Sequence, residues 1–237
     1  QFGLDYGITN NTGKVQAKEV KLIISKAIKE NISYFDTASS YGNSESILGK
    51  QIKKEEIKIN TKFQTKTNNR FTDEDIRVLE IQFHKTLDKL NKRNIETYLL
   101  HNIDDLKKIN SCLLIKWLRS LQERGFIKRI GISIYETKDL DEINLDGIEV
   151  IQIPVSIYDQ RFLNDSVLEK IMNKNISIHI RSIFLQGLLL KTASQWPSHI
   201  SSSFRNHHAN YERKISLSNL TLLESALGFI RGLDFPE

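Results

Sequence analysis

Short apolar runs alternate with amphipathic stretches along the whole chain, and this alternation restricts the fold more than any other feature. Apolar positions three to four residues apart predict helices, and short runs rich in β-branched and aromatic residues predict strands. The expected strands are the tail of one at 1–4, one ending at Asp36, and 57–62, 97–101, 127–133, 150–153 and 177–182. The expected helices are 18–31, 44–52, 72–90, 113–124, 165–175 and 217–231, with a loop from 187 to 210. Strands that alternate with helices favour parallel βαβ units.

Two architectures are built from such units: an open doubly wound sheet and a (β/α)8 barrel. A dinucleotide-binding doubly wound sheet usually carries Gly-x-Gly-x-x-Gly after its first strand, and this sequence contains no Gly-x-Gly. A barrel gathers catalytic residues from the carboxyl ends of several strands. Such residues stand at five expected strand ends: Asp36, Lys62, His101, Ser133 and Gln152. We therefore expect an α/β fold, a (β/α)8 TIM barrel that in this chain supplies seven strands and lacks the eighth strand and the C-terminal segment.

Composition limits the classes of function. With 237 residues, 39% of them hydrophobic, and no Pro- or Gly-rich linker, the chain fits a single domain over 1–237. No apolar run is long enough to span a membrane, no signal-peptide pattern opens the chain, and the single Cys112 allows no internal disulfide. We expect a cytoplasmic protein in which Cys112 is a small buried residue at the start of a helix.

The net charge of +5 is spread along the chain. Lys and Arg are interspersed with Asp and Glu, which is typical of a solvated surface, so we expect neither a nucleic-acid nor a membrane partner. A modest positive bias also suits a phosphorylated cofactor. His207 and His208 are adjacent, a poor spacing for two ligands of one metal ion, and we expect no metal.

The stretch 34–42 has the composition of a catalytic corner. A strand of bulky residues breaks into a loop of small residues, which leaves an acid, Asp36, at the strand end and a phenol, Tyr41, five positions later. The plain alternatives are that Lys62 is only a salt-bridge partner of Asp36 and that His101 is a core histidine. A lysine at the end of a barrel strand also fits a lyase that forms a Schiff base with its substrate.

Seven motifs along the chain together resemble the aldo-keto reductase family. They are Gln1-Phe2-Gly3-Leu4-Asp5-Tyr6-Gly7, Asp36-Thr37-Ala38-x-x-Tyr41-Gly42, Thr61-Lys62, Leu99-Leu100-His101, Gly131-Ile132-Ser133, Ile151-Gln152 and Arg181-Ser182-x-x-x-Gln186-Gly187-Leu188-Leu189. Each motif is weak alone, but their order and their places at strand ends make the set specific. The last motif is similar to the seventh strand of a bacterial branch of the family.

The resemblance implies a catalytic tetrad of Asp36, Tyr41, Lys62 and His101. Reduction of a carbonyl delivers hydride to carbon and leaves charge on oxygen, so a proton donor and a polarising group must meet that oxygen. In this reading Tyr41 is the general acid, and Lys62, held by Asp36, eases its ionisation. His101 donates a hydrogen bond that orients the substrate oxygen. The implied enzyme is an NAD(P)H-dependent oxidoreductase that reduces an aldehyde, ketone or sugar-like carbonyl.

The resemblance also implies a nicotinamide cofactor, NADPH by the family's common choice, with NADH as the other option. The implied cofactor residues are Ser133 and Gln152 at the carboxamide, Arg181 at the nicotinamide ring, and Ser182, Leu185 and Gln186 near the pyrophosphate. Three departures from the family stand out: Ile134 where Asn is usual, Arg181 where an aromatic is common, and no basic segment after an eighth strand. A guanidinium is planar and can stack like an aromatic ring, but it adds charge.

A different class of function also fits this sequence. The chain could be a non-catalytic regulatory or binding protein that retains the reductase barrel, although the complete tetrad argues against it. The expected partner is a small-molecule carbonyl substrate, and neither its identity nor the oligomeric state follows from the sequence. The polar stretch 196–210 is the candidate for specificity, with Trp196 either lining the pocket or anchoring the loop.

Overall fold

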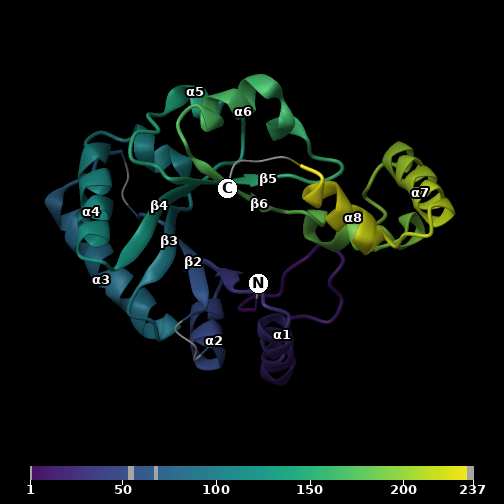
Figure 1. Cartoon of the computed structure of the whole chain (residues 1–237), viewed down its shortest axis with the longest axis horizontal. Coiled ribbons are helices and arrows are strands. Elements are labelled where there is room, and N and C mark those ends of the chain that lie inside the picture. Colours follow the sequence, from purple (N-terminus) through teal and green to yellow (C-terminus); the bar gives the residue numbers. More distant parts are fainter. Residues whose placement is uncertain (1, 53–55, 67–68, 234–237) are drawn as a thin grey trace.

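Six parallel strands form one curled sheet in the computed structural model, which describes residues 2–52, 56–66 and 69–233. The strands are β1 (Tyr34–Asp36), β2 (Lys58–Phe63), β3 (Ile95–Leu100), β4 (Ile127–Ser133), β5 (Val150–Pro154) and β6 (Ser177–Arg181). Each strand pairs with the next one in sequence, in the order β1-β2-β3-β4-β5-β6. Figure 1 shows the strands curling round a common centre. The curl brings the ends of β1 and β5 close together. A hydrogen bond of 2.9 Å from Gln152 Nε2 to Asp36 Oδ1 joins them.

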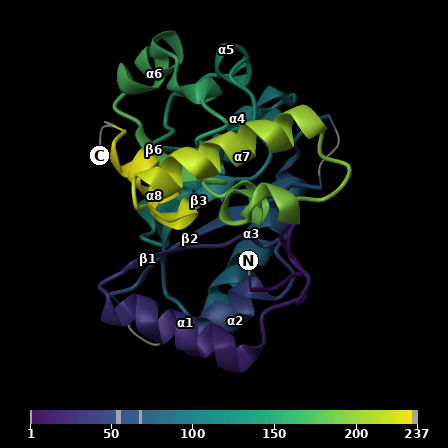
Figure 2. The same cartoon turned by 90° about the vertical axis from the view of Figure 1, so that its right-hand side faces the viewer.

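The described chain has eight α-helices, of which the first six lie round the outside of this sheet (Figure 1). They are α1 (Ala17–Lys29), α2 (Ser44–Gln51), α3 (Asp73–Leu90), α4 (Ser111–Glu123), α5 (Asp139–Glu142), α6 (Asp165–Met172), α7 (Ser202–Leu217) and α8 (Leu222–Arg231). Short 3₁₀ helices lie at η1 (Ile103–Lys107), η2 (Arg161–Leu163), η3 (Leu185–Leu190) and η4 (Ala193–Gln195). In Figure 2, α7 and α8 lie in front of the sheet, and α1 and α2 lie below it. The alternation of strands and helices that the sequence predicts is therefore confirmed.

The long helix α3 illustrates how the sequence fixes these elements. Thr72 caps its start: the Thr72 side chain accepts from the backbone N–H of Asp75, and the Asp75 side chain accepts from that of Thr72. Such a capping box satisfies two N–H groups that the helix leaves unpaired. Leu79, Phe83 and Leu90 form its buried face, and each such burial contributes about 2 kcal/mol to stability.

The structure departs from the expected elements at both ends of the described chain. Residues 2–4 are not a strand, so the described sheet has six strands rather than seven. Gln1 and residues 234–237, which belong to the first motif and to the chain end, lie outside the described residues. The expected loop at 187–210 is helical from Ser202, and the last helix begins at Leu222 rather than 217.

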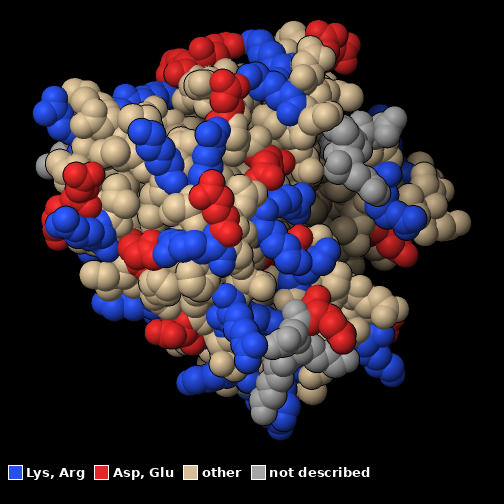
Figure 3. Space-filling model, turned by 60° about the vertical axis from the view of Figure 1, so that its left-hand side comes forward, with Lys and Arg blue, Asp and Glu red and all other residues tan. Residues whose placement is uncertain are grey.

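The charged surface, the lengths of the helices and the position of Cys112 can each be compared with the sequence. Figure 3 shows Lys and Arg interspersed with Asp and Glu over one face, as the sequence predicts. No helix in the described part of the chain is both long and apolar enough to cross a membrane. Cys112 is exposed in the first turn of α4 rather than buried, because the buried face of this helix consists of Leu114, Trp117, Leu118 and Leu121.

Candidate active site

The four residues of the expected tetrad meet at one end of the sheet. Asp36 is the last residue of β1, Lys62 lies near the end of β2, and His101 directly follows β3. Tyr41 lies in the loop between β1 and α2. Parallel pairing aligns these strand ends, with Asp36 opposite Asn60 and Lys62 opposite Leu99. The fold thus brings together residues that are far apart in the sequence.

Asp36 and Lys62 form an ion pair at the centre of this group. The Lys62 Nζ lies 2.5 Å from Asp36 Oδ2 and donates a second hydrogen bond of 3.2 Å to the backbone oxygen of Thr37. The Lys62 side chain is 1% exposed, whereas that of Asp36 is 40% exposed. Burial lowers the pKa of Lys62, and the charge of Asp36 opposes this shift. Asp36 therefore keeps a buried ammonium in place.

Tyr41 is half-buried beside this pair. The Lys62 Nζ lies 5.5 Å from the centre of its ring, and the ring meets that of His101 edge-on at 5.8 Å. Burial, followed by the charge of Asp36, raises the pKa of Tyr41 to about 12, with Arg181 acting in the opposite direction. The ammonium of Lys62 is directed at Asp36 and does not offset this rise, so the expectation that Lys62 eases the ionisation of Tyr41 stays a prediction. Tyr41 therefore holds its proton at neutral pH.

His101 is neutral at the same pH. Burial and the positive charges of Lys62 and Arg181 lower its pKa to about 4. Its Nδ1 lies 3.2 Å from Ser40 Oγ. When the hydroxyl donates to Nδ1, the ring hydrogen is on Nε2, where it can be donated to another group. His101 can thus act as a neutral hydrogen-bond donor beside Tyr41.

Two glycines hold the Tyr41 loop in position. A Cβ on Gly3 would lie 1.8 Å from the Tyr41 backbone oxygen, so the two backbones approach more closely than any side chain would permit. Gly42 has φ +58°, and its Cβ would lie 2.5 Å from the backbone oxygen of Gly3. Glycine is the residue that tolerates both demands. These contacts explain why residues 2–4 pack on the loop instead of forming a strand.

The carboxyl ends of β4, β5 and β6 carry a second group of polar atoms. Ser133 Oγ, Gln152 Oε1 and Arg181 Nε are buried without a hydrogen-bond partner among the described residues. A buried polar atom left unpaired costs about 1–3 kcal/mol. Ser133 and Gln152 lie opposite each other in the register of β4 and β5. A hydroxyl donor next to an amide oxygen acceptor complements a primary carboxamide, so these residues fit the carboxamide of a nicotinamide.

Ile134 contributes no polar side chain to this group. It is fully buried, and its backbone oxygen accepts a hydrogen bond of 3.0 Å from Arg181 Nη2. The contact that the usual asparagine would make is therefore not supplied by the side chain at this position.

The segment after β6 has an unusual backbone. Ser182, Leu185 and Gln186 have φ between 46° and 62°, and Gly187 has φ +96°. Left-handed conformations are uncommon for residues other than glycine, and they are concentrated at ligand sites. Ser182, Gln186 and Arg181 line a cavity of about 430 Å³ together with the N-terminal loop. The Ile8 N–H bonds to the Gln186 oxygen at 3.0 Å and ties this loop to the segment.

Several residues around the site were not predicted from the sequence. Asn60, Arg129 and His179 line a cavity of about 630 Å³ on the inner side of the sheet, next to Asp36 and Gln152. The period of two along a strand could have found all three, because Asn60 lies two positions before Lys62, His179 two before Arg181, and Arg129 four before Ser133. Tyr135, whose ring contacts Arg181, lies in a loop and carries no such signal.

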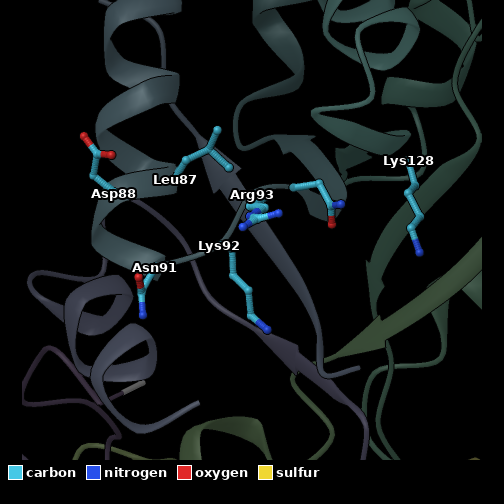
Figure 4. Close-up of a pocket in the computed structure, with 7 residues that line it drawn as sticks. Leu87, Asp88, Asn91, Lys92, Arg93 and Lys128 are labelled. Carbon is cyan, nitrogen blue, oxygen red and sulfur yellow. The ribbon is translucent and has the colours of Figure 1, made fainter. Parts of the chain in front are cut away.

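A further cavity, of about 580 Å³, lies at the other end of the sheet (Figure 4). Leu87 and Asp88 come from the last turns of α3, and Asn91, Lys92, Arg93 and Asn94 precede β3. Lys128 lies near the start of β4. The tetrad lies at the opposite, carboxyl ends of the strands, so this cavity is separate from it.

His208 and Trp196 have structural positions. His208 is fully buried, and its ring nitrogens lie 2.9 Å from Tyr158 Oη and 2.9 Å from the backbone oxygen of Lys191. Trp196 stacks on His208 and donates to the backbone oxygen of Leu188 at 2.9 Å. Trp196 therefore anchors this segment, and the apolar contacts of α7 explain why the expected loop is a helix.

Comparison with known proteins agrees with this geometry. The family model "Aldo/keto reductase family" matches residues 3–225, and the chain belongs to this family. It is 25% identical over 199 residues to the aldo-keto reductase YhdN of Bacillus subtilis, and it spans 59% of the length of that relative.

Two solved structures show the same fold. The glycerol dehydrogenase AKR11B4 of Gluconobacter oxydans has a TM-score of 0.67 and 19% identity. The match covers 90% of this chain and 72% of the dehydrogenase chain. An aldo/keto reductase of Klebsiella pneumoniae, in complex with NADP and acetate, has a TM-score of 0.68 and 14% identity. The match covers 90% of this chain and 71% of the Klebsiella chain.

Proposed function

We propose that this protein is an NAD(P)H-dependent oxidoreductase that reduces an aldehyde, ketone or sugar-like carbonyl to an alcohol. The observation that carries the proposal is the meeting of two groups at one end of the sheet. One is the paired tetrad of Asp36, Tyr41, Lys62 and His101, and the other is the pair of unsatisfied carboxamide-binding atoms on Ser133 and Gln152. The proposal includes a single reductase domain whose sheet is part of an eight-stranded barrel.

The residues of the chain have separate roles in this reaction. When bound, a dihydronicotinamide cofactor would supply hydride, that is one proton with two electrons, to the carbonyl carbon. Tyr41 transfers its proton to the carbonyl oxygen, and His101 donates a hydrogen bond that directs this oxygen toward Tyr41. The buried Lys62 ammonium, 5.5 Å from the Tyr41 ring, stabilises the phenolate that Tyr41 becomes. Asp36 positions Lys62.

The cofactor residues act by orientation. Ser133 and Gln152, whose buried oxygens are unpaired, would hold the carboxamide and so determine which face of the ring meets the substrate. Ser182, Leu185 and Gln186 provide the strained segment that borders the pyrophosphate. NADPH is the proposed cofactor because the Klebsiella relative was solved with NADP, and NADH is the other candidate.

The burial of Lys62 disfavours the lyase alternative. Schiff-base formation needs a free amine that a substrate can reach, whereas Lys62 is 1% exposed and bound to Asp36. The non-catalytic alternative predicts cofactor binding without turnover, so an experiment can separate it from the proposal.

The experiment is a titration of the purified chain with NADPH and with NADH, followed through cofactor fluorescence. A panel of carbonyl compounds is then tested for oxidation of the bound cofactor. The expected result is tighter binding of NADPH and turnover with at least one aldehyde, ketone or sugar-like carbonyl. Binding without turnover on the whole panel would favour the regulatory alternative, and binding of neither cofactor would contradict the proposal.

A further inference from the structure

Arg181 is a cation held rigidly at the end of β6. Its Nη2 donates to the backbone oxygen of Ile134 at 3.0 Å, and its Nη1 donates to Ser182 Oγ at 3.2 Å. The guanidinium lies 4.1 Å from the centre of the Tyr135 ring. Two hydrogen bonds and a stacking contact fix both the position and the plane of the group.

The charge of Arg181 has no direct counter-ion. Within the described ranges, no carboxylate forms an ion pair with its guanidinium, and its buried Nε has no hydrogen-bond partner. The charge nevertheless reaches the tetrad, since it helps to lower the pKa of His101 and opposes the rise in the pKa of Tyr41. A charge in a water-poor site acts more strongly than one at the surface.

The next step rests on the proposed function. A nicotinamide bound through Ser133 and Gln152 must also come within hydride distance of a carbonyl carbon that Tyr41 and His101 hold, about 3–3.5 Å. Arg181 lies on the strand next to Gln152, and its field reaches Tyr41 and His101. The ring is therefore within the field of the guanidinium.

The two redox forms of the cofactor differ in the charge of this ring. The reduced ring is neutral, and the oxidised ring carries one positive charge. A fixed guanidinium can stack on either ring, but it repels only the oxidised one. An aromatic residue at the same position would not make this distinction, because the face of an aromatic ring attracts a cation.

We propose that Arg181 makes the site select the reduced nicotinamide over the oxidised one. The oxidised cofactor formed by the reaction is then expelled, which favours carbonyl reduction over alcohol oxidation. Arg181 is thus a determinant of specificity for the redox state of the cofactor.

The test is a fluorescence and calorimetric titration of the full chain with NADPH and NADP⁺. Four proteins are compared: wild type, Arg181→Gln, Arg181→Lys and the control Arg77→Gln, which removes an exposed arginine on α3. In the wild type we expect NADPH to bind at least about tenfold more tightly than NADP⁺. Arg181→Gln should reduce this ratio at least about fivefold, mainly through tighter binding of NADP⁺. Arg181→Lys keeps the charge and should keep the ratio, as should Arg77→Gln.

Three other outcomes would overturn the proposal. An unchanged ratio in folded Arg181→Gln protein would show that the charge does not discriminate between the redox forms. An unchanged ratio with a raised KM for acidic carbonyl substrates would make Arg181 a substrate-carboxylate contact instead. If Arg181→Gln does not fold, Arg181→Tyr replaces it, with the same expected loss of selectivity. Wild-type protein that binds neither form would refute the proposed function itself.

Discussion

At the carboxyl ends of the strands, the two halves of the site differ in how far the protein satisfies its own polar groups, whereas Asn60 Oδ1 and Thr97 Oγ1, deeper in the first half, are unpaired too. At the ends of β1–β3, Lys62 is paired with Asp36 and Thr37, and His101 is hydrogen-bonded to Ser40. At the ends of β4–β6, the buried polar atoms of Ser133, Gln152 and Arg181 are left unpaired. Gln152 joins the two halves, since its nitrogen bonds to Asp36 while its oxygen stays unpaired.

Under the proposed function, the first half is a preorganised catalytic half, and the second is a half whose hydrogen bonding a ligand completes. The first half keeps its geometry without substrate, because its charges neutralise each other. The second carries the cost of unpaired polar atoms, which a ligand with matching donors and acceptors would remove. Substitutions in the first half should therefore impair chemistry, and those in the second should impair binding.

Among substitutions that leave the proton donor Tyr41 in place, the largest effect is expected from Lys62→Met, which removes the ammonium and keeps a similar volume. We expect kcat for carbonyl reduction to fall about 100-fold or more, because the phenolate of Tyr41 loses its stabilising charge. Stability should fall only slightly, since the remaining Asp36 is 40% exposed and still accepts from Gln152. Steady-state kinetics and thermal unfolding measure the two quantities.

The control for this variant is Lys58→Met, at the other end of β2. Lys58 is 40% exposed and bonds to Tyr34 and Glu96. This variant should keep kcat within about twofold, because surface ion pairs contribute little. Equal losses in the two variants would show that the strand, and not the ammonium at its end, is what matters.

Ser133→Ala should weaken cofactor binding and leave stability unchanged. In the free protein its hydroxyl is unpaired, so its removal should leave the free energy of unfolding unchanged within about 0.5 kcal/mol. Loss of one hydrogen bond to the cofactor should weaken NADPH binding about three- to tenfold. Fluorescence titration and chemical denaturation test the pair of expectations. The matched control Ser120→Ala, on α4, should leave NADPH binding unchanged, and an equal weakening there would refute a specific role for Ser133.

The smallest effect concerns His101 and pH. Its pKa is lowered from 6.5 to about 4 in the folded protein, so the unfolded chain takes up a proton first as the pH falls. Stability due to the neutral ring is fully present above pH 6.5 and is lost progressively down to about pH 4. After allowance for solvent at this half-buried ring, the loss is about 1 kcal/mol. Denaturation of His101→Gln between these pH values should show a correspondingly flatter decline, and an identical decline would contradict the shift.

The sequence was sufficient to predict that three polar residues of the first half stand at the ends of successive strands. Asp36, Lys62 and His101 each follow a run of strand formers, and parallel pairing of successive strands brings such ends together. The composition of 34–42 singled out Tyr41 as well, and the family resemblance then supplied its role as the general acid.

Other features depend on tertiary contacts and could not be read from local patterns. Residues 2–4 form no strand because Gly3 packs against the Tyr41 loop, and α7 is helical where His208 meets Tyr158 and Trp196. The raised pKa of Tyr41 reflects burial and the position of Asp36. None of these contacts is encoded in the spacing of neighbouring residues.

The most direct test of the division between the two halves is NADPH binding and carbonyl reduction measured side by side on Tyr41→Phe protein. This variant removes only the phenolic oxygen and its proton. We predict that NADPH binds within about twofold of wild-type affinity while the reduction rate falls about 1000-fold, because the proton donor is absent. Reduction within about tenfold of wild type, or loss of NADPH binding together with activity, would contradict the assignment of the proton donor to one half and the cofactor to the other.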